Sequence, residues 1–490
     1  MSRSQSALII RPEPSRGLGA FYRNLGITMV ATHLRRRGVP VELVDLSYDS
    51  LEHRLQAVDP TVALFSLYID DFERGIQLAA QLKAEHPRTV TMVGGPHATL
   101  LAGNVFQITS AFDVVALGDC LPEAVPMIQA LHQRRPLGTD RLIRAGSAAA
   151  RMDQTGPDYS LWGDGRYFPV FPVEFSRGCR HHCPFCTDPV LRRGVTVDPV
   201  DRTMRTLRAL VDAHGPVWVR FVDSSLSSLG VDLDRLLADL TAAQLPIQWG
   251  AYAYPSDIDH ELAERLAAAG CRALFLGIES LSSKVRTGKR HSKRLDEVAE
   301  AVGTLQRAGI FVHGNFIVGL PGETAHTLEE TRDAAGQIGF DSIGGGPFYL
   351  TPGSTFERFP QRFGIEILDP HWQLKQHRNF WDASNAYFRT ATLTQAEMRQ
   401  MAAGFRQRVE GDGTACWNLS DYAVLCWQSV GGTVGSLKRL WRLPDRVLTT
   451  TQRTVLDVLK EKLGVALDRQ QASGFVATAR IVAAEAARVG

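Results

Sequence analysis

The chain has 490 residues, of which 44% are hydrophobic, and its 54 Lys and Arg against 52 Asp and Glu give a formal net charge of +2. This length predicts about three domains with enough apolar sequence for sizeable cores. The nearly balanced charge argues against a dedicated nucleic-acid surface, which shows as a concentrated basic face. No apolar run approaches the roughly 20 residues of a membrane span, and the N-terminus lacks the form of a signal peptide, so we expect a cytoplasmic location.

Short apolar runs alternate with helical periodicity over residues 1–145. The expected strands are residues 7–10, 41–44, 62–66, 89–93 and 114–117, and the expected helices are 27–36, 72–85 and 124–134. Parallel strands need helical crossovers, so the pattern predicts an α/β, doubly wound, Rossmann-like domain with its ligand site at the carboxyl ends of the strands. Glycines there let backbone approach a large ligand closely. The candidate cofactor-binding residues in and after these loops are Ser66, Leu67, Tyr68, Gly94, Gly95, Pro96, His97, Gly118, Asp119 and Glu123.

A second series of strands and helices occupies residues 167–356, after a polar linker at 146–166. Its expected strands are 173–176, 218–221, 247–251, 273–276, 311–318 and 342–349. Six strands with intervening helices predict a partial (β/α)6 barrel, in which the chemistry sits at the carboxyl ends of the strands. The apolar pattern of residues 357–490 predicts a mostly helical C-terminal domain. Its tryptophans suit either a packed core or the wall of an organic-ligand pocket: Trp372, Trp381, Trp417, Trp427 and Trp441.

Three of the seven cysteines lie close together in the segment SRGCRHHCPFC. A [4Fe–4S] cluster normally takes four thiolates, so Cys179, Cys183 and Cys186 without a fourth predict a cluster with one open iron. A zinc site would need a fourth ligand, and His181 and His182 lie inside the loop, where their ring geometry would be strained. An odd number of cysteines and no secretory segment argue against disulfides. Isolated cysteines such as Cys271 and Cys426 are expected to be buried small hydrophobes.

The cysteine segment, with Phe185 just before the last cysteine, resembles the signature of radical S-adenosylmethionine (SAM) enzymes, in which SAM occupies the open iron. Upstream, NLGITMVATHLRRRGVPVELVDL, MVGGPHAT and VVALGDCLPEAV resemble the cobalamin-binding domain of one large branch of that superfamily. The chain is thereby identified as a cobalamin-dependent radical SAM enzyme of the class B methyltransferase type. It contains no Asp-x-His-x-x-Gly motif, so we expect cobalamin bound base-off without that histidine. A doubly wound domain that has lost its cofactor is the alternative.

The resemblance also implies roles for single residues. Glu279 in Gly-Ile-Glu-Ser would reach the SAM ribose or amino group, although it could instead pair with a surface lysine. Relatives often carry an arginine where this chain has Tyr254, and Tyr252 or Arg220 are further stand-ins for it. Tyr254 and Glu279 are therefore the candidate catalytic residues. The remaining expected SAM contacts are Phe185, Asp223, Asn315, Val318 and Tyr349.

The family resemblance implies radical methylation of a carbon centre in a small-molecule substrate, of natural-product or amino-acid-like type. A reduced cluster cleaves SAM, the 5′-deoxyadenosyl radical takes a hydrogen atom, and methylcobalamin delivers the methyl group. Rearrangement, ring contraction or cyclisation without methyl transfer is the alternative, and a non-catalytic corrinoid-binding or metal-binding module is a third. The expected partners are the substrate and an electron donor such as flavodoxin or ferredoxin, with no nucleic acid and no membrane. We also expect the carboxyl ends of the two sheets to face a shared cavity.

Overall fold

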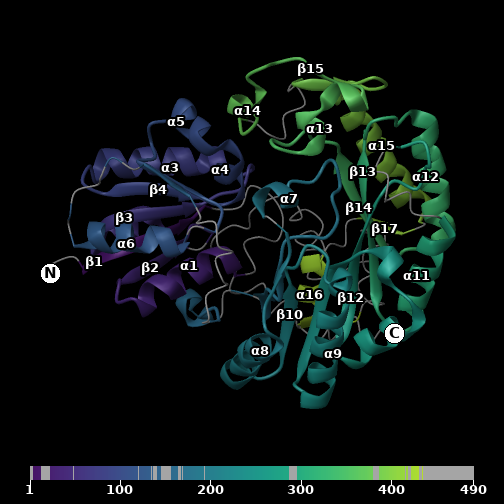
Figure 1. The fold of residues 1–490 in the computed structure, drawn as a ribbon, viewed down its shortest axis with the longest axis horizontal. Helices are drawn as coiled ribbons and strands as arrows, with labels where there is room; N and C mark the ends of the chain where they lie inside the picture. Colours follow the sequence, from purple (N-terminus) through teal and green to yellow (C-terminus); the bar gives the residue numbers. More distant parts are fainter. Residues whose placement is uncertain are drawn as a thin grey trace, which may run out of the picture. The chain divides into compact units, whose positions relative to one another are not determined.

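The protein is described by a computed structural model, which divides the chain into two compact units (Figure 1). Unit 1 contains the described residues of 1–167 and 371–378, and unit 2 contains those of 169–370 and 386–433. The domain boundaries expected from the sequence stay a prediction. The structure describes residues 4–12, 23–47, 49–119, 121–133, 135, 139, 141–144, 156–163, 167, 169–192, 194–285, 295–378, 386–413, 415–417, 421–429 and 433.

Unit 1 is built on a parallel sheet of six strands in the order β2-β1-β3-β4-β5-β6 (Figure 1). The chain enters at β1, next to the edge strand β2, and strand order reverses between β1 and β3. The carboxyl ends of these two strands are therefore the topological switch point where such folds bind ligands. The predicted doubly wound fold is confirmed. The strands are β1 Ser4–Arg11, β2 Val41–Asp45, β3 Val58–Ser66, β4 Val90–Gly94, β5 Val114–Leu117 and β6 Leu142–Arg144.

The helices of unit 1 follow from apolar periodicity and local caps. Helix α1 begins where the Asn24 side chain accepts a hydrogen bond from the Ile27 amide (3.2 Å), and α2 begins at a Ser50 cap. Leu8 and Phe65 on the central strands are fully buried between the helical layers. The helices are α1 Leu25–Arg36, α2 Leu51–Ala57, α3 Phe72–Glu85, α4 Pro96–Leu101, α5 Val105–Ile108, α6 Leu121–His132 and the short α14 Trp372–Lys375.

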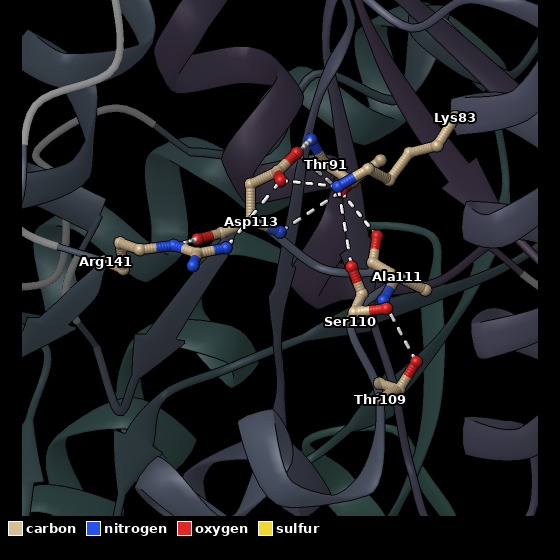
Figure 2. A network of polar contacts seen from close by, with 7 residues as sticks. All are labelled: Lys83, Thr91, Thr109, Ser110, Ala111, Asp113 and Arg141. Carbon is tan, nitrogen blue, oxygen red and sulfur yellow. Dashed lines mark hydrogen bonds and ion pairs between the residues drawn. The ribbon is translucent and has the colours of Figure 1, made fainter.

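The amino-terminal edge of this sheet is tied together by Asp113 (Figure 2). One carboxylate oxygen accepts hydrogen bonds from the Thr91 amide and hydroxyl (both 3.0 Å), and the other accepts from Lys83 Nζ (2.6 Å). The Asp113 carbonyl accepts a further bond from Arg141 Nε (2.7 Å). Strands β4 and β5 are therefore locked together at the edge opposite the predicted ligand site.

We expect Asp113→Ala to lower the free energy of unfolding by roughly 1–3 kcal/mol, because it leaves the Thr91 amide without its charged acceptor. Urea unfolding of both proteins measures the difference. The control is Glu85→Ala, which removes an exposed carboxylate on α3 and should change stability by less than about 0.5 kcal/mol. Equal stability of Asp113→Ala and Glu85→Ala would contradict the role given to Asp113.

Unit 2 is a second parallel sheet, in the order β17-β14-β13-β12-β11-β10-β7 (Figure 1). All six strands predicted for the partial barrel are present, and β17 joins at its edge, beside β14. The first strand begins and ends three residues earlier than predicted, because the following residues turn into the cysteine loop. The strands are β7 Val170–Val173, β10 Val217–Phe221, β11 Ile247–Ala253, β12 Cys271–Glu279, β13 Phe311–Val318, β14 Ser342–Pro347 and β17 Cys416–Trp417.

Two sides of this sheet are covered by helices from different parts of the chain. Trp249 points toward the end of α10, where its Nε1 donates to the Ala269 carbonyl (2.8 Å). The next residue, Gly250, points to the other side, where a Cβ would lie 3.1 Å from Leu425 on α16. Neighbouring strand residues face opposite sides, so α10 and α16 lie on opposite faces. The helices are α8 Val200–His214, α9 Val231–Ala243, α10 His260–Ala268, α11 Leu295–Arg307, α12 Ala325–Ile338, α15 Gln395–Asp412 and α16 Asp421–Ser429.

Helix α16 contacts β7, β10, β11 and β12, so the described part of the C-terminal region packs into the barrel sheet itself. Cys271 and Cys426 are fully buried, which confirms the prediction for both. Trp372 and Trp427 are also buried, as the core interpretation requires. Trp381, Trp441 and the side chain of Trp417 lie outside the described residues. In the part of the chain that is described, no helix is long and apolar enough to cross a membrane.

Candidate functional site

The three predicted cluster ligands lie on one loop, which follows β7 at the carboxyl end of the unit 2 sheet. Cys179, Cys183 and Cys186 are all half-buried, and the Cys183 carbonyl accepts the Cys186 amide (3.0 Å). Two backbone amides point at thiol sulfurs, from His181 to Cys179 and from Asp188 to Cys186 (both 3.4 Å). Hydrogen bonds of this kind to the ligand sulfurs are one of the ways in which proteins tune Fe–S clusters.

Burial raises the pKa of the Cys186 thiol to about 11, and the charges of Asp188, Cys179 and Glu279 add to the rise. Burial also raises the pKa of Cys179. Without metal these thiols hold their protons at neutral pH, and they become thiolates as iron replaces the protons. The site therefore suits a metal cluster better than a free nucleophilic thiolate.

A glycine and a buried carboxylate shape the start of the loop. Gly178 has a φ of +87°, and a Cβ on it would lie 2.0 Å from the Gly194 carbonyl oxygen, so only glycine fits. Asp223, at the end of β10, accepts hydrogen bonds from Ser176 Oγ (2.6 Å) and the Phe175 amide (3.2 Å). The sequence assigned Asp223 to cofactor binding, and the structure gives its carboxylate these contacts at the base of the cysteine loop.

The far side of the cysteine loop is held by the segment that follows β14. Thr351 Oγ1 donates to the Phe185 carbonyl (3.0 Å), and the Phe356 amide donates to the Pro184 carbonyl (2.9 Å). The Phe185 ring is half-buried. Its backbone position is thus fixed from the last strand of the predicted barrel.

Tyr254 and Glu279 lie beside the cysteines. Burial raises the pKa of the Tyr254 hydroxyl, and the negative charges of Glu279 and Cys183 raise it further. The same Glu279 acts on Cys186. Tyr254, just after β11, stacks on His181 of the cysteine loop, and the catalytic roles of Tyr254 and Glu279 stay a prediction.

The backbone of Glu279 is unusual. Its φ is +60°, in the left-handed region that non-glycine residues seldom adopt, and the register of β12 on β13 shifts between Gly277 and Glu279. Such strain is typical of functional positions. The carboxylate turns back over Gly277, where a Cβ would lie 2.7 Å from Glu279 Oε1. The glycine of Gly-Ile-Glu-Ser thus makes room for the acid.

The other predicted SAM contacts have separate surroundings. Asn315 on β13 is half-buried and donates weakly to the Leu276 carbonyl (3.5 Å). The Val318 carbonyl already accepts the Phe348 amide (2.7 Å), and Tyr349 is half-buried in the next residue position. Buried Glu323 caps the loop after β13 by accepting the Gly319 amide. The loop is therefore held by its own polar contacts.

Of the two other stand-ins for the missing arginine, neither has the surroundings of Tyr254. The Arg220 guanidinium lies over the Tyr252 ring (4.6 Å to the centroid) and near the Phe275 ring (5.9 Å). Arg220 is only 3% exposed. Arg220 and Tyr252 thus form part of the sheet's packed inner row, whereas Tyr254 faces the cysteines.

In unit 1 the predicted loops after β3 and β4 meet at one edge. The Leu67 amide donates to the Gly94 carbonyl (3.0 Å), and the Leu67 carbonyl accepts the His97 amide (3.3 Å). Gly95 has a φ of +92°, and a Cβ would lie 2.6 Å from the Leu67 nitrogen. Gly118 joins them, because its amide donates to Thr99 on α4 (2.9 Å).

The side chains at this edge differ in exposure. Ser66 and Asp119 are half-buried, Glu123 is exposed, and Tyr68 is 51% exposed. His97 is instead buried, with its ring edge-on to Phe72 (centroids 4.8 Å apart). The histidine therefore belongs to the layer beneath the loop, while Tyr68 presents its surface to solvent.

The described site contains residues that sequence reasoning missed. The sequence suggests His181 only as a possible zinc ligand, and it gives no role in the site to Ser227, Ser228 or Asp257. They join the cysteine loop to the ends of β10 and β11. Ser and Asp are common in loops, so their spacing alone gives no signal of this contact.

Comparison with known proteins agrees with this division of the chain. A match to the B12 binding domain spans residues 18–120, and a match to the Radical SAM superfamily spans residues 173–335. The chain is a member of the cobalamin-dependent radical SAM family. Its cofactors are a [4Fe–4S] cluster, SAM and cobalamin, and Cys179, Cys183 and Cys186 stay the predicted ligands of the cluster.

Relatives differ in the reactions that their names give. The chain is 24% identical over 317 residues to an anaerobic magnesium-protoporphyrin IX monomethyl ester cyclase of Rubrivivax gelatinosus, covering 59% of this chain and 57% of that one. It is 22% identical over 348 residues to the bacteriochlorophyllide d C-12(1)-methyltransferase of Chlorobaculum tepidum, covering 66% and 72%. The chain thus spans little more than half the length of the cyclases that it matches.

Among solved structures, the radical S-adenosylmethionine methyltransferase TsrM from Kitasatospora setae, with cobalamin and a [4Fe-4S] cluster bound, matches with a TM-score of 0.66. The match covers 99% of this chain and 100% of that one at 16% sequence identity. At this identity the match shows a shared fold over both units.

We expect Gly178→Ala to abolish cluster binding, because the added Cβ would collide with the Gly194 carbonyl and displace Cys179. Iron and sulfide per chain after anaerobic reconstitution measure the effect. Gly404→Ala on α15, where a Cβ would meet nothing within 4 Å, is the matched control and should bind a full cluster. A Gly178→Ala protein with the wild-type iron content would contradict the assigned role.

Asp223 predicts a pH dependence of stability. Burial raises its pKa to about 7, whereas the unfolded carboxyl ionises near its ordinary value of about 3.9. Between these values only the unfolded state is ionised, so stability falls as pH rises toward 7. From pH 5 to pH 7.5, the free energy of unfolding of the wild type should fall by at least about 1.4 kcal/mol relative to that of Asp223→Asn.

The experiment uses the metal-free protein and urea unfolding at each pH. Asp212→Asn, which changes an exposed carboxylate on α8, should follow the wild type at every pH. Parallel curves for the wild type and Asp223→Asn would show that Asp223 is ionised in the folded protein and would refute the prediction.

Proposed function

We propose that this protein is a methyltransferase that methylates a carbon centre of a small-molecule substrate. The observation that carries the proposal is a three-cysteine loop whose His181 stacks on Tyr254, in a chain that also has a B12-binding domain. The bacteriochlorophyllide methyltransferase and the shared fold of TsrM support methyl transfer.

The chain's own residues supply binding and orientation. Cys179, Cys183 and Cys186 hold the cluster, and the Glu279 carboxylate accepts hydrogen bonds from the ribose or amino group of SAM. Tyr254 offers a hydroxyl that is protonated at neutral pH and can donate a hydrogen bond. When bound, the cluster, SAM and methylcobalamin supply the electron, the 5′-deoxyadenosyl radical and the methyl group.

The proposed substrate must bind next to the methyl donor, because a carbon radical is short-lived. The loops of unit 1 that would face the corrin are Ser66–Tyr68, Gly94–His97 and Gly118 with Asp119. The proposed electron donor is a flavodoxin or ferredoxin.

Cyclisation without methyl transfer is the second candidate, and the 24% identity to the magnesium-protoporphyrin IX monomethyl ester cyclase favours it. Both reactions would use the same cysteine loop. They differ in what happens to SAM: radical methylation yields S-adenosylhomocysteine together with 5′-deoxyadenosine, whereas cyclisation yields 5′-deoxyadenosine alone.

The test is anaerobic incubation of the reconstituted enzyme with SAM, methylcobalamin, reduced flavodoxin and a panel of substrates. The panel contains tetrapyrroles, tryptophan and other aromatic amino acids. We expect a product heavier by one methylene unit and both SAM products in equal amounts. 5′-Deoxyadenosine with a product lacking the added methylene would overturn methylation in favour of cyclisation.

Glu279→Gln is expected to lower product formation at least about 100-fold, since a neutral amide loses the charge-assisted hydrogen bond to SAM. The matched control is Glu264→Gln, which changes an exposed carboxylate on α10 and should keep wild-type turnover. Wild-type turnover by Glu279→Gln would remove the carboxylate from the catalytic site.

A further inference from the structure

His181 joins the cysteine loop to the segments that follow β10 and β11 through two contacts. It lies between Cys179 and Cys183 in the sequence, and its ring stacks on the ring of Tyr254, with centroids 4.1 Å apart and an interplanar angle of 29°. Its Nε2 lies 2.8 Å from Ser228 Oγ. The side chain therefore bridges the segment that carries two cluster ligands and the aromatic residue that faces them.

The partners of Ser228 fix which group donates. Ser228 Oγ donates its proton to Asp257 Oδ2 (2.6 Å), so it can only accept from His181. With its proton on Nε2, His181 donates to Ser228 Oγ, and Ser228 Oγ donates to Asp257, which makes a continuous chain of hydrogen bonds. Ser225 Oγ, 2.8 Å from Ser228 Oγ, is a second donor to the same oxygen.

Asp257 also holds the backbone of Tyr254. The same Oδ2 accepts from Ser227 Oγ (2.9 Å), and Ser227 Oγ in turn accepts the Tyr254 amide (2.8 Å). Asp257 therefore fixes Tyr254 by its main chain and, through Ser228 and His181, by its ring.

The orientation of the ring determines what the Tyr254 hydroxyl faces. Glu279 and Cys183 are the charged groups that act on that hydroxyl most strongly. The stack with His181 restricts rotation of the Tyr254 ring about its Cα–Cβ bond, and with it the direction of the hydroxyl. The contact thus controls a polar group at the open side of the cysteine loop.

We propose that His181 is a positioning residue for SAM: it fixes the ring of Tyr254 next to the cysteine loop. The inference rests on the proposed function, since it assumes that SAM binds next to these residues. It assigns no ligand role to His181, because its Nε2 is directed at Ser228. Substitution should weaken SAM binding and leave cluster assembly intact.

The experiment compares anaerobically reconstituted full-length variants. Iron and sulfide contents measure cluster assembly. SAM binding is measured by its Kd from an equilibrium titration and by the change that SAM causes in the EPR spectrum of the reduced cluster. The variants are His181→Ala, His181→Phe, Ser228→Ala and the control His182→Ala. His182 is the next residue along, and it is exposed.

We expect all four variants to carry a wild-type cluster. His181→Ala should bind SAM about tenfold more weakly, which corresponds to about 1.4 kcal/mol, and His181→Phe should recover part of this loss because it keeps the stacked ring. Ser228→Ala should weaken binding a few-fold, and His182→Ala should bind SAM as the wild type does. A wild-type Kd for His181→Ala, or loss of the cluster in that variant, would overturn the proposal.

A double-substitution cycle separates positioning from a general structural effect. If His181 acts through Tyr254, adding His181→Ala to Tyr254→Ala should cause no further loss of SAM affinity. An additive loss would refute action through Tyr254. If the SAM-binding pattern holds but no methylated product forms, the proposed function fails and the inference stands; if product forms and His181→Ala binds SAM normally, only the inference fails.

Discussion

The cysteine loop must present three sulfurs in a fixed arrangement without a fourth protein ligand to organise them. The backbone of the loop must therefore hold the three sulfurs in place, and contacts at three places in the structure do so. Gly178 passes against the Gly194 carbonyl at the start, His181 reaches Ser228 in the middle, and Thr351 and Phe356 hold Pro184 and Phe185 near the end. The loop is thereby fixed by Gly194 and by the segments that follow β10 and β14.

Glu279 shows how the sheet delivers a carboxylate to this loop. A regular strand would alternate its side chains between the two faces. The register shift after Gly277 and the φ of +60° at Glu279 break that alternation at the last residue of β12. The cost of the strained backbone is of order 1–3 kcal/mol, and the buried contacts of Ile278 and Ser280 on either side hold it in place.

Much of this could be predicted from the sequence because it depends on local pattern. Alternating apolar runs gave both sheets, and the spacing of Cys179, Cys183 and Cys186 gave the site. The His181 contact could not be predicted, since it depends on how far the loop reaches toward Ser228, 47 positions away. Nor could α16: its run of buried residues, Val424 to Trp427, suits any buried helix and does not say which face of which sheet it covers.

The place of α16 has a consequence for where the reaction can occur in unit 2. Leu425 packs against Gly250, which pairs in register with Arg220. One row further along the strands, Tyr252 and Phe275 pair in register, and Phe275 pairs with His313, whose Nδ1 lies 3.0 Å from Ser342 Oγ. These side chains fill the inner face of the sheet as a packed core, which is how the interiors of such barrels are built. Tyr254 and the cysteine loop lie beyond this row, at the carboxyl edge of the sheet.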